Sequence, residues 1–157
     1  MTATATQRAK PAPRFLLRIF WALHRAIYRG TGGRIGLSQP REGKKFGMLR
    51  LTTVGRRSGQ QRQVMVGFYP DGENLVTLAM NGWGEAEPAW WLNLQARPDA
   101  TVELADGGRR PVRAREAIGS ERDRLWERFD RFPGWGDVEA LAAHRSRTTA
   151  VVVLEPR

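Results

Sequence analysis

The stretch LRLTTVGRRSGQQR, residues 49–62, places a turn rich in glycine and arginine between two apolar runs. The runs themselves, residues 46–54 and 63–69, have the composition of β-strands, so the stretch predicts a β-hairpin. Glycines let backbone N–H groups converge on a ligand, while hydroxyls and guanidiniums complete a cradle for an oxyanion. We therefore expect the turn to bind a phosphate, a carboxylate or a phosphodiester. A solvated hairpin tip is the alternative interpretation.

Two known phosphate-binding patterns are excluded for this turn. No Gly-Lys-Ser/Thr follows it, so it is not a P-loop, and it lacks the glycine spacing of a dinucleotide fingerprint.

Further strands are predicted at residues 74–80, 101–104, 111–118 and 151–154, with tight-turn signals at Asp71-Gly72 and Asp106-Gly107-Gly108. Helices are predicted after Pro88 and before Pro98, from a capping-box-like start at Ser120 and Asp123, and over residues 138–145. About six strands joined mostly by hairpins favour an antiparallel sheet that closes into a small barrel, with helices over its openings. The predicted fold class is α+β.

Residues 1–29 differ from the rest of the chain in composition and in the pattern of charged and apolar residues. Residues 1–13 are small, polar and proline-containing, which predicts disorder, and residues 14–157 are expected to form a single domain. Residues 14–29 predict an amphipathic helix with Arg14, Arg18, Arg25 and Arg29 on one face. This helix is too short and too charged to span a membrane. It would pack on the domain or on a second subunit, or lie on an anionic membrane. A cytoplasmic location is expected, with membrane association left open.

Composition narrows the chemistry that this chain performs. The 157 residues carry 26 basic and 16 acidic side chains, a net charge of +10 that favours acidic partners. Cysteine is absent, which excludes disulfides and cysteine nucleophiles, and only His24 and His144 are present, so no metal site is expected. If the protein is an enzyme, a bound cofactor carries the chemistry. Nucleic-acid binding is disfavoured, because the aromatic residues do not interleave with the basic ones.

Four segments in order resemble the deazaflavin-dependent nitroreductase family, also called the F420H2-dependent quinone reductases. They are residues 51–62, Ala79-Met80-Asn81-Gly82, residues 88–99 and residues 151–156. The resemblance implies a split β-barrel of the FMN-binding type that binds coenzyme F420, with FMN as the alternative cofactor. It further implies hydride transfer from the reduced coenzyme to a quinone or another electron-poor conjugated acceptor. A non-catalytic cofactor- or lipid-binding barrel is the alternative function, and a homodimer is a family expectation.

The resemblance also implies roles for particular residues. No catalytic side chain is expected, because the cofactor carries the hydride. The implied cofactor-binding residues are Thr53, Gly55, Arg56, Arg57, Ser58, Gly59, Arg62, Val64, Met65, Val66, Ala79, Met80, Asn81 and Trp90. The implied substrate-side residues are Trp135, Val138 and Leu141, which occupy the region where nitroimidazole-reducing members have tyrosines that are not evident here. Asn81 likewise stands where well-studied family members carry a lysine.

Overall fold

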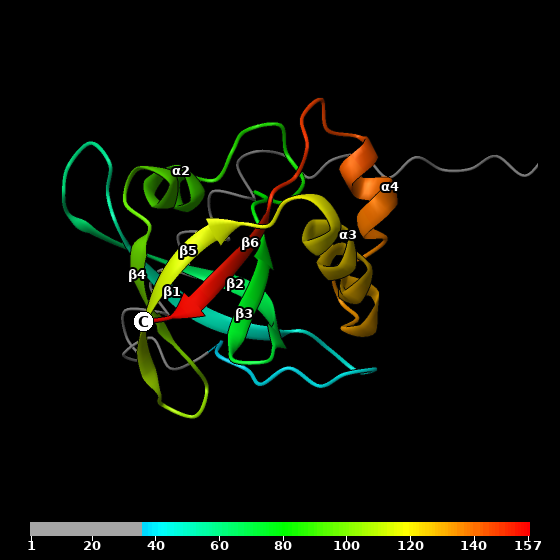
Figure 1. Cartoon of the computed structure of the whole chain (residues 1–157), viewed down its shortest axis with the longest axis horizontal. Coiled ribbons are helices and arrows are strands. Elements are labelled where there is room, and N and C mark those ends of the chain that lie inside the picture. The colour runs from blue at the N-terminus through cyan, green and yellow to red at the C-terminus, as the bar shows by residue number, and fades with distance from the viewer. Residues whose placement is uncertain (1–35) are drawn as a thin grey trace, which may run out of the picture. The chain divides into compact units, whose positions relative to one another are not determined.

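Six antiparallel strands close into a barrel in residues 36–157, the part of the chain that this computed structural model describes (Figure 1). The strands are β1 (Gly47–Val54), β2 (Gln61–Asp71), β3 (Asn74–Leu78), β4 (Asp99–Glu103), β5 (Arg109–Glu116) and β6 (Val151–Pro156). Their order around the barrel is β1-β2-β3-β6-β5-β4, and β4 pairs with β1 to close it. The predicted antiparallel barrel is confirmed. The expected disorder of residues 1–13 and the expected helix at 14–29 lie outside the described residues.

Local hairpins and two distant pairings build this barrel. Strands β1 and β2, β2 and β3, and β4 and β5 are neighbours in both sequence and space. The last strand, β6, lies between β3 and β5, with Leu154 opposite Leu75 on one side and Ala114 on the other. The turn from β2 to β3 contains Gly72 at φ 62°, a backbone conformation that glycine adopts without strain.

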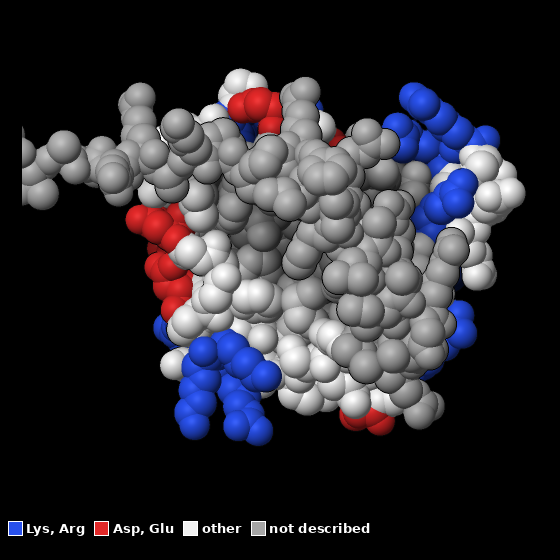
Figure 2. All heavy atoms as spheres, turned by 180° about the vertical axis from the view of Figure 1, so that it is seen from behind, with Lys and Arg blue, Asp and Glu red and all other residues white. Residues whose placement is uncertain are grey.

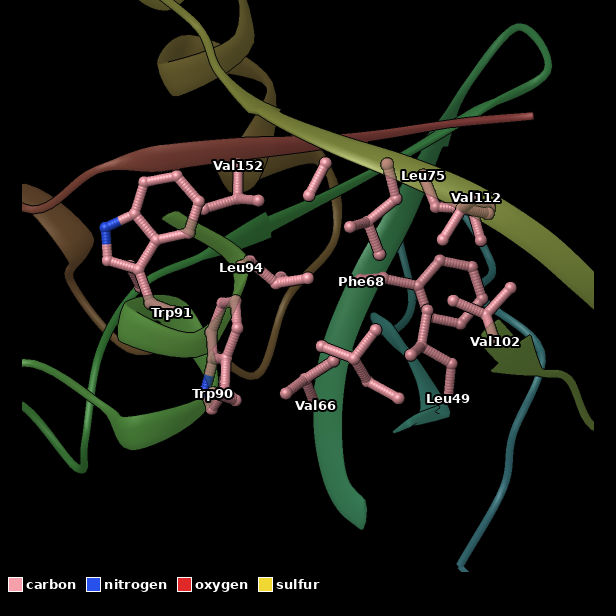
Figure 3. Packing of buried hydrophobic residues seen from close by; sticks show 14 of the residues in the cluster. Leu49, Val66, Phe68, Leu75, Trp90, Trp91, Leu94, Val102, Val112 and Val152 are labelled. Atoms are coloured by element: carbon pink, nitrogen blue, oxygen red, sulfur yellow. The ribbon is translucent and has the colours of Figure 1, made fainter. Parts of the chain in front are cut away.

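The barrel interior is filled by apolar side chains that alternate along each strand. Leu49 and Leu51 on β1 are fully buried, as is Leu154 on β6, because residues two apart on a strand face the same side. The helix α2 (Ala89–Ala96) adds Trp90, Trp91 and Leu94 to the same cluster, as Figure 3 shows. This helix follows Pro88, as predicted. Its two indoles therefore belong to the core of the barrel.

A second apolar cluster lies on the outer side of the sheet. Tyr69 on β2 and Val76 on β3 pack there against Leu125 and Phe129. These come from α3 (Gly119–Glu127) and the 3-10 helix η1 (Arg128–Arg131), and α4 (Val138–Ala143) lies beside them in Figure 1. The predicted capping-box start of α3 is wrong: the helix begins at Gly119 without a side-chain cap. Glu121 is instead held by two hydrogen bonds from Arg115, of 2.7 and 2.8 Å.

Polar contacts at the end of β2 attach α3 and η1 to the barrel. The Tyr69 hydroxyl, whose pKa is raised by burial, donates a 2.6 Å hydrogen bond to the carbonyl of Leu125. Asp71 accepts two hydrogen bonds from Arg124, at 3.1 and 2.9 Å, and one from Arg128. The Arg124 hydrogen bond is the main reason that the pKa of Asp71 lies below its ordinary value of 3.8.

We expect Asp71→Asn to weaken the fold in a way that depends on pH. The lowered pKa means that ionised Asp71 stabilises the protein above pH 3.8, and that this stabilisation is lost as pH falls through the folded-state pKa below it. Near pH 7 the variant should lose about 1.5–3 kcal/mol of unfolding free energy, as for a charged hydrogen bond. Denaturant unfolding of both proteins at about pH 7 and about pH 3 measures this. A difference that does not shrink at low pH would contradict the assignment.

Candidate functional site

The turn between β1 and β2 is a compact loop whose shape depends on two glycines. Gly55 N–H donates to the carbonyl of Gln60, and Gly59 N–H donates to the carbonyl of Gly55, both at 2.8 Å. Gly59 has φ 68°, and a Cβ on Gly55 would lie 2.8 Å from the Ser58 hydroxyl oxygen. Either residue would therefore be strained as alanine. The loop therefore has a defined backbone shape, although the side chains of residues 56–62 are exposed.

Asn93 on α2 attaches this loop to the body of the barrel. Its side-chain oxygen accepts a 3.0 Å hydrogen bond from the backbone N–H of Arg56, and its side-chain nitrogen donates a 3.1 Å hydrogen bond to the Thr53 hydroxyl. Asn93 is 5% exposed and Thr53 is 1% exposed, so water does not compete for the bond between them, and the bond from Arg56 is partly buried. The sequence carried a signal that pointed to Asn93, a lone amide between Trp91 and Leu94 on an apolar helix. Sequence reasoning did not assign it to the site.

Four arginine side chains lie in or beside this loop. Arg56, Arg57 and Arg62 are exposed, and Arg62 donates a 3.5 Å hydrogen bond to Ser58. Arg97, which follows α2, places its Nη1 4.0 Å from the position that a Cβ on Gly59 would occupy. Sequence reasoning also missed Arg97. Within residues 36–157, no ion pair joins any of these four arginines to an acid.

The four arginines, which we call the loop arginines (Arg56, Arg57, Arg62 and Arg97), form a local positive site. Figure 2 shows Lys and Arg side chains gathered at several places around the edge of the face that it draws. Positive charge that lacks an acidic neighbour attracts anions, and guanidinium forks suit phosphate and carboxylate oxygens. A phosphodiester with several carboxylates fits this set of donors.

The three residues expected beneath the cofactor ring, Val64, Met65 and Val66, lie on β2, and their side chains point to opposite faces of the strand. Val64 and Val66 point into the barrel, where they pack with the interior cluster. Met65 lies between them and faces outward, because neighbouring side chains on a strand alternate. Of these three side chains, only that of Met65 is available on the outer face of β2.

The other expected cofactor contacts differ widely in exposure. Ala79, just after β3, is fully buried, Met80 is half-buried against the outer cluster, and Asn81 is exposed. Trp90 is 7% exposed and belongs to the interior cluster. The structure therefore places Trp90 in the core, where it supports α2.

Of the expected substrate-side residues, Trp135 lies against strand β2, two residues from Met65 along the strand. Trp135 covers Gly67, because a Cβ on Gly67 would lie 2.7 Å from Cη2 of Trp135, and Gly67 shares the outer face of β2 with Met65. Trp135 and Val138 are buried in the outer cluster together, whereas Leu141 is half-buried and lies in neither cluster. The buried indole N–H of Trp135 has no hydrogen-bond partner among the described residues.

Neither a metal-binding cluster nor a membrane-spanning helix is present in the described residues. No group of three or more His, Cys, Asp or Glu in residues 36–157 could hold a metal ion. No helix in the same range is long and apolar enough to cross a membrane.

The closed six-stranded antiparallel barrel is of the split-barrel class, and its β1–β2 hairpin carries unpaired positive charge among residues 36–157. Residues 21–156 match the family model described as F420H(2)-dependent quinone reductase, and the chain belongs to this family. The protein is thus an oxidoreductase, and coenzyme F420 is its cofactor, as the sequence resemblance implied.

Relatives and solved structures agree with this assignment. An F420H(2)-dependent quinone reductase of Mycobacterium tuberculosis is 38% identical over 108 residues, which cover 67% of this chain and 69% of the relative. A solved F420-H2 dependent reductase has a TM-score of 0.62 at 25% identity and covers 76% of this chain and 96% of its own. A solved chain described as a domain-swapped dimer has a TM-score of 0.64 at 24% identity, covers 89% of this chain and 98% of its own, and shares the fold.

Proposed function

We propose that this protein binds coenzyme F420 at the loop arginines and catalyses the reduction of a quinone. The observation that carries the proposal is the fixed loop between β1 and β2, whose guanidiniums have no acidic partner among residues 36–157. The side chain of coenzyme F420 contains a phosphodiester and glutamates, so its negative charge is complementary to the positive charge of the loop. Each charged hydrogen bond would contribute about 1.5–3 kcal/mol to binding.

The residues of this chain bind and orient, and none of them changes covalently. When bound, reduced F420 supplies the hydride that the quinone accepts. The loop arginines and Ser58 would hold the anionic tail, and Asn93 keeps the loop in the shape that this requires. Met65 and Met80 would offer apolar surface to the ring. Orientation of the two reactants is the main contribution of such a site to the rate, and solvent would complete the proton balance.

Trp135 and Val138 are proposed for the acceptor side of the site, with Leu141 at its border. Trp135 lies against Gly67, two residues from Met65 on the same face of β2, so ring and acceptor would meet there. A quinone carbonyl accepts hydrogen bonds, and the indole N–H of Trp135 is a donor that is not yet used within the described residues. Asn81, exposed at the end of this region, would contribute an amide where relatives with a lysine contribute charge.

Fluorescence titration and a turnover assay test the function. We expect oxidised F420 to lose ring fluorescence on binding, and FMN to bind more weakly. Reduced F420 should then be oxidised when quinones are added. Binding of F420 without oxidation across a panel of quinones would indicate the non-catalytic binding protein instead. Tighter binding of FMN than of F420 would contradict the cofactor assignment at this site.

Three further expectations stay predictions. The first is a homodimer, which a single chain does not test. The second is contact of residues 14–29 with a membrane, and these residues lie outside the described part of the chain. The third is a cytoplasmic location. The proposed reaction requires none of them.

A further inference from the structure

Arg145 is a buried arginine for which the reaction described above has no use. It follows α4, in the segment that leads to β6, and its side chain has no exposed surface. Burying a guanidinium costs several kcal/mol unless partners compensate for the lost water. Its partners therefore indicate what the buried charge holds in place.

Those partners connect three separate segments. Nη1 donates a 2.6 Å hydrogen bond to the hydroxyl of Thr149 and a 3.4 Å one to the backbone carbonyl of Ala79. Nη2 lies 3.8 Å from a carboxylate oxygen of Glu87. Nε and Nη2 make no hydrogen bond with the described residues, so the charge is only partly compensated. One guanidinium thus contacts both ends of the loop formed by residues 79–88.

The segment around Arg145 also fastens the rest of this loop. Ala79 N–H donates to the carbonyl of Ala150 at 2.9 Å, so the backbone of Ala79 is held at its N–H as well as its carbonyl. Ser146 donates to Glu85 from its backbone at 2.9 Å and from its hydroxyl at 2.6 Å. Within the loop, Trp83 has φ 62°, a conformation that costs energy for a residue other than glycine. The loop keeps this strained form because it is fixed at both ends.

We propose that Arg145 is a positioning residue for the cofactor site. By fixing the carbonyl of Ala79 it sets the position of Met80 and Asn81, and through Glu87 it sets the start of α2, which carries Asn93. The proposal rests on the proposed function, because only there are Met80 and Asn81 cofactor contacts. Arg145 acts through these backbone positions and does not itself touch the cofactor.

The test compares Arg145→Met with the control Arg147→Met. Arg147 lies 3.6 Å from the same Glu87 oxygen but is half exposed and donates no hydrogen bond to Ala79, so its loss removes a charge near Glu87 and leaves the Ala79 carbonyl held. We expect Arg145→Met to speed hydrogen exchange of the Ala79, Met80 and Gly84 amides in the cofactor-free protein. It should raise the dissociation constant for oxidised F420 about tenfold and the KM for reduced F420 similarly, with the quinone KM unchanged. Arg147→Met should leave all of these within about twofold.

Thr149→Val keeps the proposal testable if Arg145→Met does not fold. It removes the 2.6 Å hydrogen bond that orients the guanidinium and should raise the F420 dissociation constant about threefold. Exchange rates and F420 affinity equal to those of Arg147→Met, in either folded variant, would overturn the positioning role. Failure of the unmodified protein to bind F420 would instead overturn the proposed function, and the exchange measurement on the cofactor-free protein would still show whether Arg145 orders the loop.

Discussion

Replacing Arg56 and Arg57 together with alanine should raise the dissociation constant for coenzyme F420 at least about tenfold, and nearer a hundredfold if both contact the phosphodiester. Both side chains are exposed and form no ion pair in residues 36–157. Their loss therefore removes favourable charge from the bound state and almost nothing from the fold. The melting temperature should stay within about 2 °C of the original, as for other surface substitutions. Fluorescence titration and thermal unfolding measure the two quantities.

A matched control separates a local contact from general loss of charge. The control replaces Arg109 and Arg110, two exposed residues on β5, with alanine. It changes the net charge by the same amount as the replacement of Arg56 and Arg57. That control should keep F420 affinity within about threefold at physiological salt, because distant surface charges are screened. Equal losses in the two double variants would show that only the net charge matters, which would refute a binding loop.

Asn93→Leu should weaken both the fold and cofactor binding. The side chains are similar in size, but leucine leaves the buried Thr53 hydroxyl and the partly buried Arg56 N–H without their partners. Losing buried hydrogen bonds in this way costs about 2–4 kcal/mol of unfolding free energy. The released loop should also bind F420 about tenfold more weakly, because the loop would lose conformational entropy when F420 binds. Denaturant unfolding and F420 titration of the same preparation measure both effects.

Gln95 offers a control on the same helix. It is exposed, so Gln95→Ala should change the unfolding free energy by no more than about 0.5 kcal/mol and leave F420 affinity unchanged. If Asn93→Leu loses stability but binds F420 as before, Asn93 belongs only to the core and does not shape the site.

The strands of this fold could be predicted because their signals are local. Alternating apolar residues and the turns at Gly72 and Gly107 appear in the sequence within a few residues of the structure they produce. Element boundaries were predicted less well: β3 ends at Leu78 where the sequence predicted residue 80, and at the start of α3 a serine in a capping position was outweighed by the pairing of Arg115 with Glu121. A local signal of that kind competes with contacts that the sequence does not reveal.

The candidate site was predictable only where one segment contained it. The loop from Gly55 to Arg62 is such a segment, and its arginines were found from composition and glycine spacing. Asn93 was missed because its partners are 37 and 40 positions away, and Arg145 because the Ala79 carbonyl that it holds is 66 positions away, so these roles exist only after the barrel has formed. Arg145 in particular is the last residue of the helix predicted over residues 138–145, and a charged residue at a helix end is typically solvated.

The position of β6 between β3 and β5 affects how this chain matures during translation. Until residues 151–156 have left the ribosome, both neighbouring strands keep an unpaired edge, and the interior leucines and indoles stay reachable by water. A nascent chain of this kind exposes aggregation-prone surface and depends on late, distant pairing, which slows folding. We therefore expect the newly made protein to acquire protease resistance in one step, after its final strand has docked.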